Sequence, residues 1–275
     1  MSFLITILSL VATQVMVGFV LWVYYRANRD LQSAFWWAIC LFSVALGWLF
    51  NVGRAFAPEW FTVIFSNTAF LLSSLALLAG TQSYFGKRIS LEIMLMWLLL
   101  SMVTLLFYLF VYDDIIMRVI ISTLAILAPL LLSLGMFIRF FRASAAFVGT
   151  ILSLSILIVI LSNYVGLIIY EMPSPTEYRE SIGSIALYVI QPGATIGFGL
   201  FGLLLLMLRL DAKLLQQSRR DYMTSVLNRY GFTEYCEGLV EEQQQKPEAL
   251  SLMYIDLDFF KQINERWGHQ IADEI

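Results

Sequence analysis

The C-terminal residues of the chain hold most of the side chains that could do chemistry. Asp256 and Asp258 follow an apolar run and are separated by a single residue, and Lys261 comes after them. In α/β domains ligands gather where strands end, and helix N-termini favour phosphate. Mg²⁺ takes carboxylate oxygens together with substrate phosphates. This pattern permits a magnesium–nucleotide site. Taken alone it also fits two solvated turn residues, and without a longer motif we favour that simpler interpretation.

Two longer motifs surround these residues, "DYMTSVLNRYGF" from Asp221 and "YIDLDFFKQINERWGHQIADEI" from Tyr254. In this order and separation they resemble the start of a GGDEF domain, the catalytic module of diguanylate cyclases. The family patterns are D-x-L-T-G-L-x-N-R-R-x-F and Asp-x-Asp-x-Phe-Lys-x-x-Asn-Asp-x-x-Gly-His-x-x-Gly-Asp. The matching positions are Asp221, Thr224, Asn228, Arg229, Phe232, Asp256, Asp258, Phe260, Lys261, Asn264, Gly268, His269 and Asp273.

The resemblance implies an α/β fold of the nucleotidyl-cyclase type and the conversion of two GTP molecules to cyclic di-GMP. Asp256 would bind Mg²⁺ or Mn²⁺, with the carbonyl of Leu257 as a second ligand. Lys261 and the backbone at Phe259 and Phe260 would hold the triphosphate. These expectations are carried over from the family and concern residues at matching positions only.

The same resemblance assigns the remaining matched residues. Asn264 and Asp273 would recognise the guanine edge. Structural support is expected from Asp221, Asn228, Arg229, Asp258 and His269. The chain departs from the family pattern at Met223, Ser225, Val226, Glu265 and Ala272. Ala272 replaces a glycine, and a side chain there can shift the neighbouring Asp273.

The motif that names the family does not occur in this sequence, because the 275 residues contain no Gly-Gly pair. In the family that hairpin supplies a second metal carboxylate and part of the groove for the second GTP. The product-inhibition motif Arg-x-x-Asp is also absent. We predict a helix from an Asn228 N-cap to Lys246, then a strand over 249–255 without sheet neighbours. We expect the front of a larger protein, or a product truncated within the domain, that is catalytically incomplete by itself.

The composition is that of a membrane protein. The chain is 60% hydrophobic and 13% charged, whereas soluble domains average about 45–50% and about 25%. Residues 211–275 carry 7 Lys/Arg and 12 Asp/Glu, while residues 1–210 carry 10 and 8. We therefore predict a membrane sensor domain at 1–208, a signalling linker helix at 209–220 and an incomplete GGDEF domain at 221–275. The net charge of −3 offers no basic surface for a nucleic-acid polymer.

Seven apolar segments are long enough to cross a lipid bilayer, which takes about 20 residues as a helix. They are 3–25, 34–53, 61–85, 89–111, 115–138, 145–170 and 182–208. The predicted fold class is an all-α polytopic bundle of seven transmembrane helices, followed by a truncated α/β GGDEF domain.

Basic residues fall in alternate connections between these segments. They are Arg26, Arg29, Lys87, Arg88, Arg139 and Arg142, with Arg209, Lys213, Arg219 and Arg220 after the last segment. The other connections are poorer in basic residues and include the Asp113–Asp114 pair. The positive-inside rule then places the N-terminus outside and the C-terminus in the cytoplasm of a bacterial inner membrane. An odd number of spans requires the same arrangement.

Polar groups at membrane depth are often functional, and we take six as candidate contacts for an unknown sensory ligand. They are Asn51, Arg54, Asn67, Gln82, Asn163 and Gln191. The alternative is that they form hydrogen bonds between helices or lie near an interface. Four residues of the last span, Leu203, Met207, Leu210 and Leu214, repeat at 4-3-4 spacing, and Gln217 continues the register. This seam suits a parallel homodimer through Leu203–Gln217, or it is simply the cytoplasmic end of a span.

Several other classes are excluded or disfavoured by residues that are missing. All four lysines lie outside the spans, which excludes a retinal Schiff base, and the single histidine, His269, excludes a histidine-ligated haem in the membrane. The helix after the last span has no histidine, which disfavours a histidine kinase. Two functions remain: a membrane receptor with a diguanylate cyclase output, or a non-enzymatic sensor or transporter-like protein with a degenerate GGDEF tail. Paired charges inside the spans would favour the second, and the sequence indicates almost none.

Overall fold

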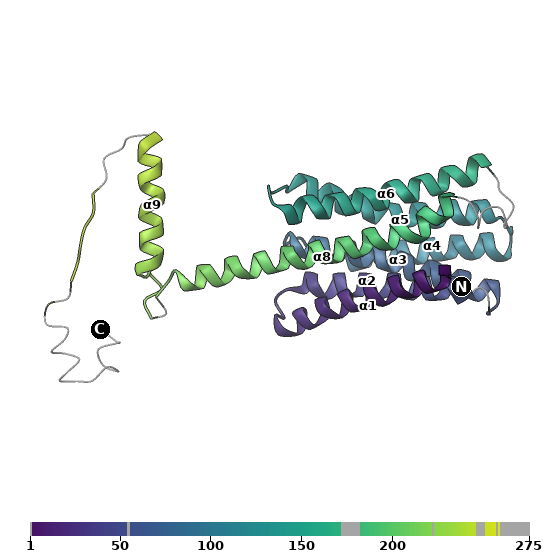
Figure 1. The fold of residues 1–275 in the computed structure, drawn as a ribbon, viewed down its shortest axis with the longest axis horizontal. Helices are drawn as coiled ribbons and strands as arrows, with labels where there is room; N and C mark the ends of the chain where they lie inside the picture. The colour runs from purple at the N-terminus through teal and green to yellow at the C-terminus, as the bar shows by residue number, and fades with distance from the viewer. Residues whose placement is uncertain are drawn as a thin grey trace. The chain divides into compact units, whose positions relative to one another are not determined.

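The computed structural model describes residues 2–53, 56–171, 182–221, 223–245, 251–256 and 258. Its helices are α1 (Ser2–Ala27), α2 (Gln32–Val52), α3 (Glu59–Tyr84), α4 (Leu91–Phe110), α5 (Ile115–Arg139), α6 (Ala145–Glu171), α8 (Ile182–Ser218) and α9 (Arg229–Gln245). The chain divides into a helical unit, Met1–Met207, and a C-terminal unit, Leu208–Ile275. Helix α8 is continuous across that boundary (Figure 1).

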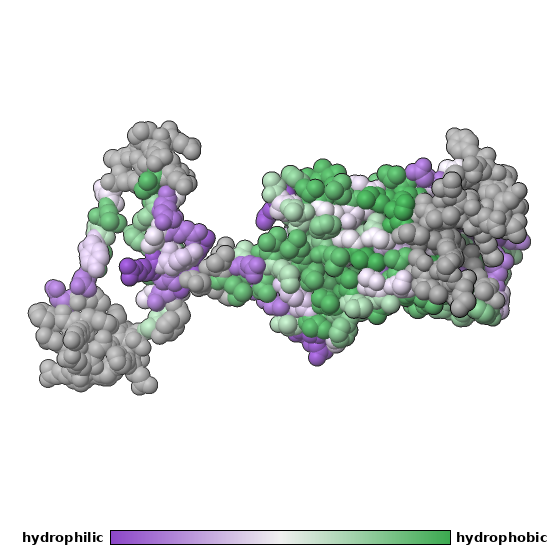
Figure 2. Space-filling view, in the orientation of Figure 1, coloured by the Kyte–Doolittle hydropathy of each residue, from purple (hydrophilic) through white to green (hydrophobic). Residues whose placement is uncertain are grey.

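Seven helices of the described residues are long and apolar enough to be membrane spans, which confirms the all-helical fold class predicted for this region. The segments are Ile7–Ala27, Gln32–Val52, Glu59–Tyr84, Leu91–Phe110, Ile115–Arg139, Ala145–Gly166 and Ile190–Leu214. On the face of the helical unit drawn in Figure 2, most of the coloured surface is hydrophobic. Helix α4 is the extreme case, with only Met94 and Leu105 buried among otherwise apolar residues. A helix that is apolar on all sides has the character of a membrane span, and the unit is that of a multi-pass membrane protein.

The short polar connections begin and end the helices through local hydrogen bonds. Asp114 caps α5 by accepting a bond of 3.0 Å from the amide of Met117. Ser144 accepts a bond of 3.3 Å from the amide of Phe147 at the start of α6. Gly86 follows α3 at a φ of 65°, a left-handed conformation that glycine adopts without strain. These residues explain why the apolar segments are separate helices.

The core of the helical unit is centred on Trp37, which is completely buried together with Phe137 and Phe198. The Trp37 ring stacks on Tyr84 at 5.7 Å and meets Phe198 edge-on at 5.5 Å. Offset and edge-on arrangements are the favoured geometries for aromatic pairs. These rings come from α2, α3, α5 and α8, so the last span is packed directly into the core.

Glycines let the helices approach closely around this core. A Cβ atom on Gly199 would lie 2.8 Å from Leu41 Cδ1 and 2.9 Å from Val17 Cγ1. A Cβ atom on Gly202 would lie 3.1 Å from the Trp37 ring. Small residues serve the same purpose at many membrane helix interfaces. Two glycines of the last span therefore have a packing role, whereas Gly193 faces open space.

The predicted strand at 249–255 is not formed in its described part. Residues 251–256 have no strand assignment, and all of them are exposed. A strand needs a neighbour to pair its backbone groups, and the described residues provide none for this segment. The predicted strand is therefore wrong for these residues, as the absence of sheet neighbours explains.

Candidate functional site

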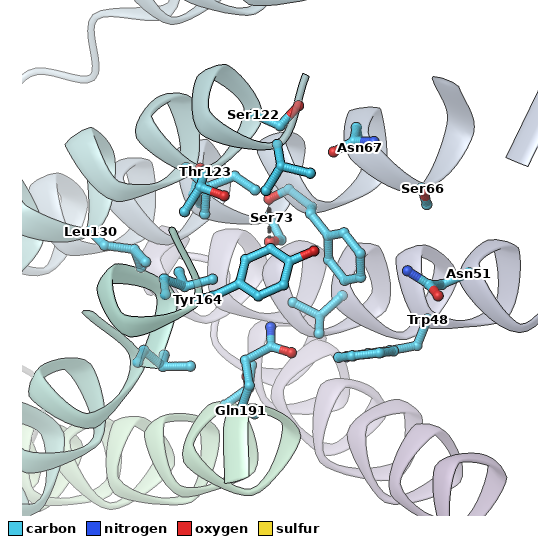
Figure 3. A pocket seen from close by; sticks show the side chains of 18 of the residues that line it. Trp48, Asn51, Ser66, Asn67, Ser73, Ser122, Thr123, Leu130, Tyr164 and Gln191 are labelled. Carbon is cyan, nitrogen blue, oxygen red and sulfur yellow. Dashed lines mark hydrogen bonds between the residues drawn. The ribbon is translucent and has the colours of Figure 1, made fainter. Parts of the chain in front are cut away.

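A cavity of about 200 Å³ lies inside the helical unit, between α2, α3, α5, α6 and α8. Its polar lining residues are Asn51, Glu59, Ser66, Asn67, Ser73, Ser74, Arg118, Ser122, Thr123, Tyr164, Gln191 and Thr195. Its apolar lining includes Trp48, Phe70, Leu77, Leu130 and Leu157 (Figure 3). A largely apolar pocket with a few converging polar groups is the usual form of a small-molecule site.

The structure brings three of the six polar candidates, Asn51, Asn67 and Gln191, to this cavity. Asn67 donates a hydrogen bond of 2.8 Å to the carbonyl of Val63 on its own helix. The side chains of Asn51 and Gln191 form no hydrogen bond with a described residue. In Figure 3 Gln191 lies near Tyr164, and Asn51 lies beside Trp48. The cavity thus contains amide groups that a bound molecule could engage.

Of the other three polar candidates, those that the structure describes are not among the residues that line this cavity. Asn163 is exposed and donates a bond of 2.8 Å to the carbonyl of Val159, which satisfies it on the surface of α6. Gln82 does not line the cavity, and its Oε1 atom is buried without a partner among the described residues. Arg54 lies outside the described residues.

Arg118 is a cavity residue that the sequence reasoning missed. Its side chain is only 9% exposed, although it forms ion pairs with Glu59 at 3.8 Å and Asp113 at 3.5 Å. The sequence contained one indication: an arginine lies in the first turn of an apolar segment that acidic residues precede. Sequence alone could not tell that its side chain turns inward rather than towards water.

Most hydroxyl groups around the cavity are satisfied by their own helix. Ser73 donates to the carbonyl of Phe70 at 2.6 Å, and Ser74 donates to that of Leu71 at 2.9 Å. Thr195 donates to the carbonyl of Gln191 at 2.8 Å. Such bonds to the preceding turn leave the hydroxyl oxygen free to accept a further bond.

In the C-terminal unit, Asp221 organises the connection between α8 and α9. Its Oδ1 atom accepts bonds from the Met223 amide at 3.1 Å, the Thr224 amide at 3.0 Å and the Thr224 hydroxyl at 3.1 Å. The bonds from Thr224 and then Met223 lower the pKa of the Asp221 carboxyl, because they stabilise its ionised form. The first aspartate and the threonine of the motif therefore hold a turn.

The end of the same motif begins α9. Asn228 Oδ1 accepts a bond of 3.0 Å from the Gly231 amide, which confirms the predicted N-cap. The Asn228 amide donates to the carbonyl of Arg219 at 2.8 Å, and Arg219 forms an ion pair with Glu234. These contacts tie the start of α9 to the end of α8. Arg229, the first residue of α9, is exposed.

Ser225 occupies the position where the family pattern has glycine. Its φ is 59°, in the left-handed region. A non-glycine residue in that region carries a cost of about 1–2 kcal/mol. This chain therefore accepts some strain at a turn position where glycine would carry none.

The second motif is described only in part. Asp256 and Asp258 are exposed. Their carboxylates suit a hard cation by donor chemistry, although the described residues contain no group of three or more His, Cys, Asp or Glu that could hold a metal. The other predicted residues of this motif, Leu257, Phe259, Phe260, Lys261, Asn264, His269 and Asp273, lie outside the described residues.

Comparison with known proteins addresses the C-terminal residues. Residues 218–275 match the family described as "Diguanylate cyclase, GGDEF domain". Diguanylate cyclase A of Treponema denticola is 39% identical over 66 residues, 23% of this chain and 18% of that protein. Diguanylate cyclase DgcS of Shewanella oneidensis is 34% identical over 59 residues, 22% of this chain and 20% of that protein.

A third relative carries a different activity in its name. Cyclic di-GMP phosphodiesterase NbdA of Pseudomonas aeruginosa is 36% identical over 64 residues, 23% of this chain and 8% of that protein. The chain thus spans about a fifth or less of the length of these relatives. No solved structure matches the chain. Residues 218–275 are a segment of a GGDEF domain, joined to a region of seven helices with the length and composition of membrane spans.

Proposed function

We propose that this chain is the membrane receptor part of a signalling protein whose cytoplasmic output converts two GTP molecules to cyclic di-GMP. The observation that carries the proposal is the continuity of α8, which includes the seventh apolar span and ends at Ser218, where the GGDEF match begins. A receptor and an output joined by one helix can communicate through that helix. The proposed parts are a sensor domain at 1–208, a linker at 209–220 and a GGDEF domain from 221.

The proposed nucleotide site follows the family motif. Asp256 and the carbonyl of Leu257 would hold Mg²⁺ or Mn²⁺, and the ion would neutralise charge on the triphosphate when bound. Lys261 and the backbone at Phe259 and Phe260 would hold the phosphates. Guanine would be recognised by Asn264 and Asp273, while Asp258 and His269 would support the site. The turn at Asp221 and the cap at Asn228 would fix the helix entering the domain.

We further propose that the protein lies in a bacterial inner membrane with its C-terminus in the cytoplasm. At the ends of α1, α3 and α5 the basic groups lie near aromatic rings, an arrangement suited to a membrane interface. Arg26 lies 5.4 Å from the Trp22 ring, and Lys87 lies 5.4 Å from that of Phe140. The acidic residues Glu59, at the start of α3, and Asp113, just before α5, lie on the side assigned to the outside.

A homodimer through Leu203–Gln217 completes the proposal, because joining two GTP molecules needs two facing GGDEF domains. Within the single chain Met207 is 45% exposed and Leu214 is 53% exposed. Leu203, one heptad step before Leu210, packs against the core of the helical unit. The exposed seam residues support a pairing face on this part of α8.

We expect no cyclic di-GMP from these 275 residues alone, because the sequence contains no Gly-Gly pair. A chimera tests this expectation. Residues 1–275 would be joined to the rest of the catalytic domain of the Treponema denticola relative, and purified protein would be assayed with GTP and Mg²⁺. The chimera should make cyclic di-GMP and the 275-residue chain should not. Asp256→Ala should abolish synthesis, while Glu237→Ala, an exposed acidic residue on α9, should leave it unchanged.

Product from the short chain, or an active Asp256→Ala chimera, would overturn the proposed site. The second candidate remains a non-enzymatic or transporter-like membrane protein. Its supporting observation is the buried Arg118, whose pairing with Glu59 and Asp113 places charges at one end of the bundle. An inactive chimera that takes up a radiolabelled solute in vesicles would favour this candidate.

A further inference from the structure

We propose that the cavity of the helical unit binds a small monocarboxylate with an apolar body, and that Arg118 receives its carboxylate. The inference concerns a binding site and a ligand class. Only its meaning as the sensed signal rests on the proposed receptor function, because binding itself does not depend on a cyclase output.

Arg118 gives the cavity a positively charged group. The side chain of Arg118 lines the cavity and is more than nine-tenths buried. It forms no hydrogen bond with a described residue, and its two ion pairs, at 3.8 Å and 3.5 Å, are longer than hydrogen bonds. A guanidinium carries five N–H donors, so those of Arg118 remain available to an acceptor in the cavity. A ligand carboxylate could accept two of these bonds side by side.

Two carboxylates already lie near Arg118. The side chains of Glu59 and Asp113 are 72% and 82% exposed. Water solvates these two carboxylates and weakens their attraction to Arg118. Both groups can turn to water when a ligand arrives, so the ligand carboxylate would replace their partial contact with Arg118. The local charge therefore does not exclude an acid.

The shape of the cavity below Arg118 also limits the ligand. Lining residues extend along α5 from Arg118 to Leu130, roughly 18 Å at 1.5 Å per residue. Leu77, Leu130 and Leu157 at the inner end belong to the buried core. The site therefore has a charged end near the connections and an apolar end in the middle of the bundle. A molecule with one acidic end and one apolar end matches this polarity.

The volume of the cavity and its uncharged polar groups narrow the ligand class further. An apolar cavity of about 150 Å³ accepts benzene, and this cavity of about 200 Å³ has room for one ring with a short acid. Asn51 and Gln191 also line the cavity, with side-chain amides that have no described partner. Arg118 is the only basic residue among the lining residues, so one ligand carboxylate is enough. A ring or branched chain carrying one carboxylate fits best.

The experiment measures binding to the 275-residue chain in lipid nanodiscs. The probe is 4-fluorophenylacetate, followed by ¹⁹F line broadening, with 4-fluorophenylacetamide and 4-fluorophenethylamine as matched neutral and cationic probes. The acid should bind saturably and at least tenfold more tightly than the other two. Arg118→Gln should weaken acid binding at least tenfold and remove the preference over the amide. Arg139→Gln, on the exposed end of the same helix, should change neither.

Ser122→Leu gives a second variant that keeps Arg118 and reduces the cavity, and it should weaken both the acid and the amide. The proposal is overturned if the three probes partition equally, if Arg118→Gln binds the acid like the parent, or if Ser122→Leu binds both probes like the parent. It is also overturned if 4-fluorophenylacetate, 3-phenylpropionate and 4-methylpentanoate all fail to bind. Because the readout is binding, an inactive cyclase chimera would leave this result intact, and absent binding would not affect cyclic di-GMP synthesis.

Discussion

Gly80 lies so close to Trp37 in the core that a larger side chain at position 80 should destabilise the fold. A Cβ atom on Gly80 would lie 2.3 Å from Trp37 Cδ1 and 2.5 Å from Trp37 Nε1. Ordinary carbon contacts lie at about 3.5–4.0 Å, so the Gly80→Ala change requires the Trp37 ring to move by about 1 Å. That ring is completely buried, stacked on Tyr84 and edge-on to Phe198. Overpacking of this kind costs about 1–3 kcal/mol.

The matched control is Gly135→Ala on α5. A Cβ atom there meets nothing within 4 Å, and alanine is a better helix former than glycine by about 1 kcal/mol. The free energy of unfolding, measured by reversible SDS titration in mixed micelles, should fall for Gly80→Ala and stay equal or rise for Gly135→Ala. The two substitutions are chemically identical, so their opposite signs would come from packing alone.

A double-mutant cycle identifies the partner. In a Trp37→Ala background the ring atoms that the new methyl group would meet are gone, so the cost of Gly80→Ala should fall by at least about 1 kcal/mol. The reasoning fails if Gly80→Ala is as stable as the parent chain. It also fails if the cost is the same with Trp37 and with alanine at that position, because the contact would then not be the source of the loss.

Four further predictions concern the connection after the membrane unit and the topology. Ser225→Gly should remove left-handed strain and slow amide exchange at Asn228, by up to about 1 kcal/mol of local opening free energy; faster exchange would contradict this. Because the pKa of Asp221 is lowered in the folded chain, its ionised carboxylate stabilises the connection above the ordinary carboxyl pKa of about 3.9. This stabilisation is lost as the pH falls below that value. Amide protection in the connection, corrected for the intrinsic exchange rate at each pH, should therefore fall at acidic pH, and Asp221→Asn should remove that dependence. In the active chimera, one residue inserted after Ala212 turns the downstream helix by roughly 100° and should alter synthesis sharply, whereas seven residues should largely preserve it; equal effects would make the helix a passive tether. Reporter fusions at Arg142 and Ser174 should lie on opposite sides of the membrane, and a shared side would refute the seven-span topology.

The sequence by itself determined the features that depend on local pattern. Runs of apolar residues predicted seven spans. Six of the helices differ from them by at most two residues at either end, whereas α8 continues to Ser218, beyond the predicted end at residue 208. Asn228 was identifiable as a cap because an amide side chain before a helix satisfies a free backbone N–H. The GGDEF segment was identifiable because its motifs are continuous in sequence.

Only the tertiary structure decided which polar groups meet. Asn67 and Asn163 are both asparagines in apolar helices, yet the first lines the cavity and the second faces outward. Arg118 turns inward, although its place near a helix start permits either direction. An apolar span carries almost no periodic contrast between its faces, so its sequence does not fix how the helix is rotated. That rotation follows from packing, in particular from where Gly80, Gly199 and Gly202 admit neighbouring side chains.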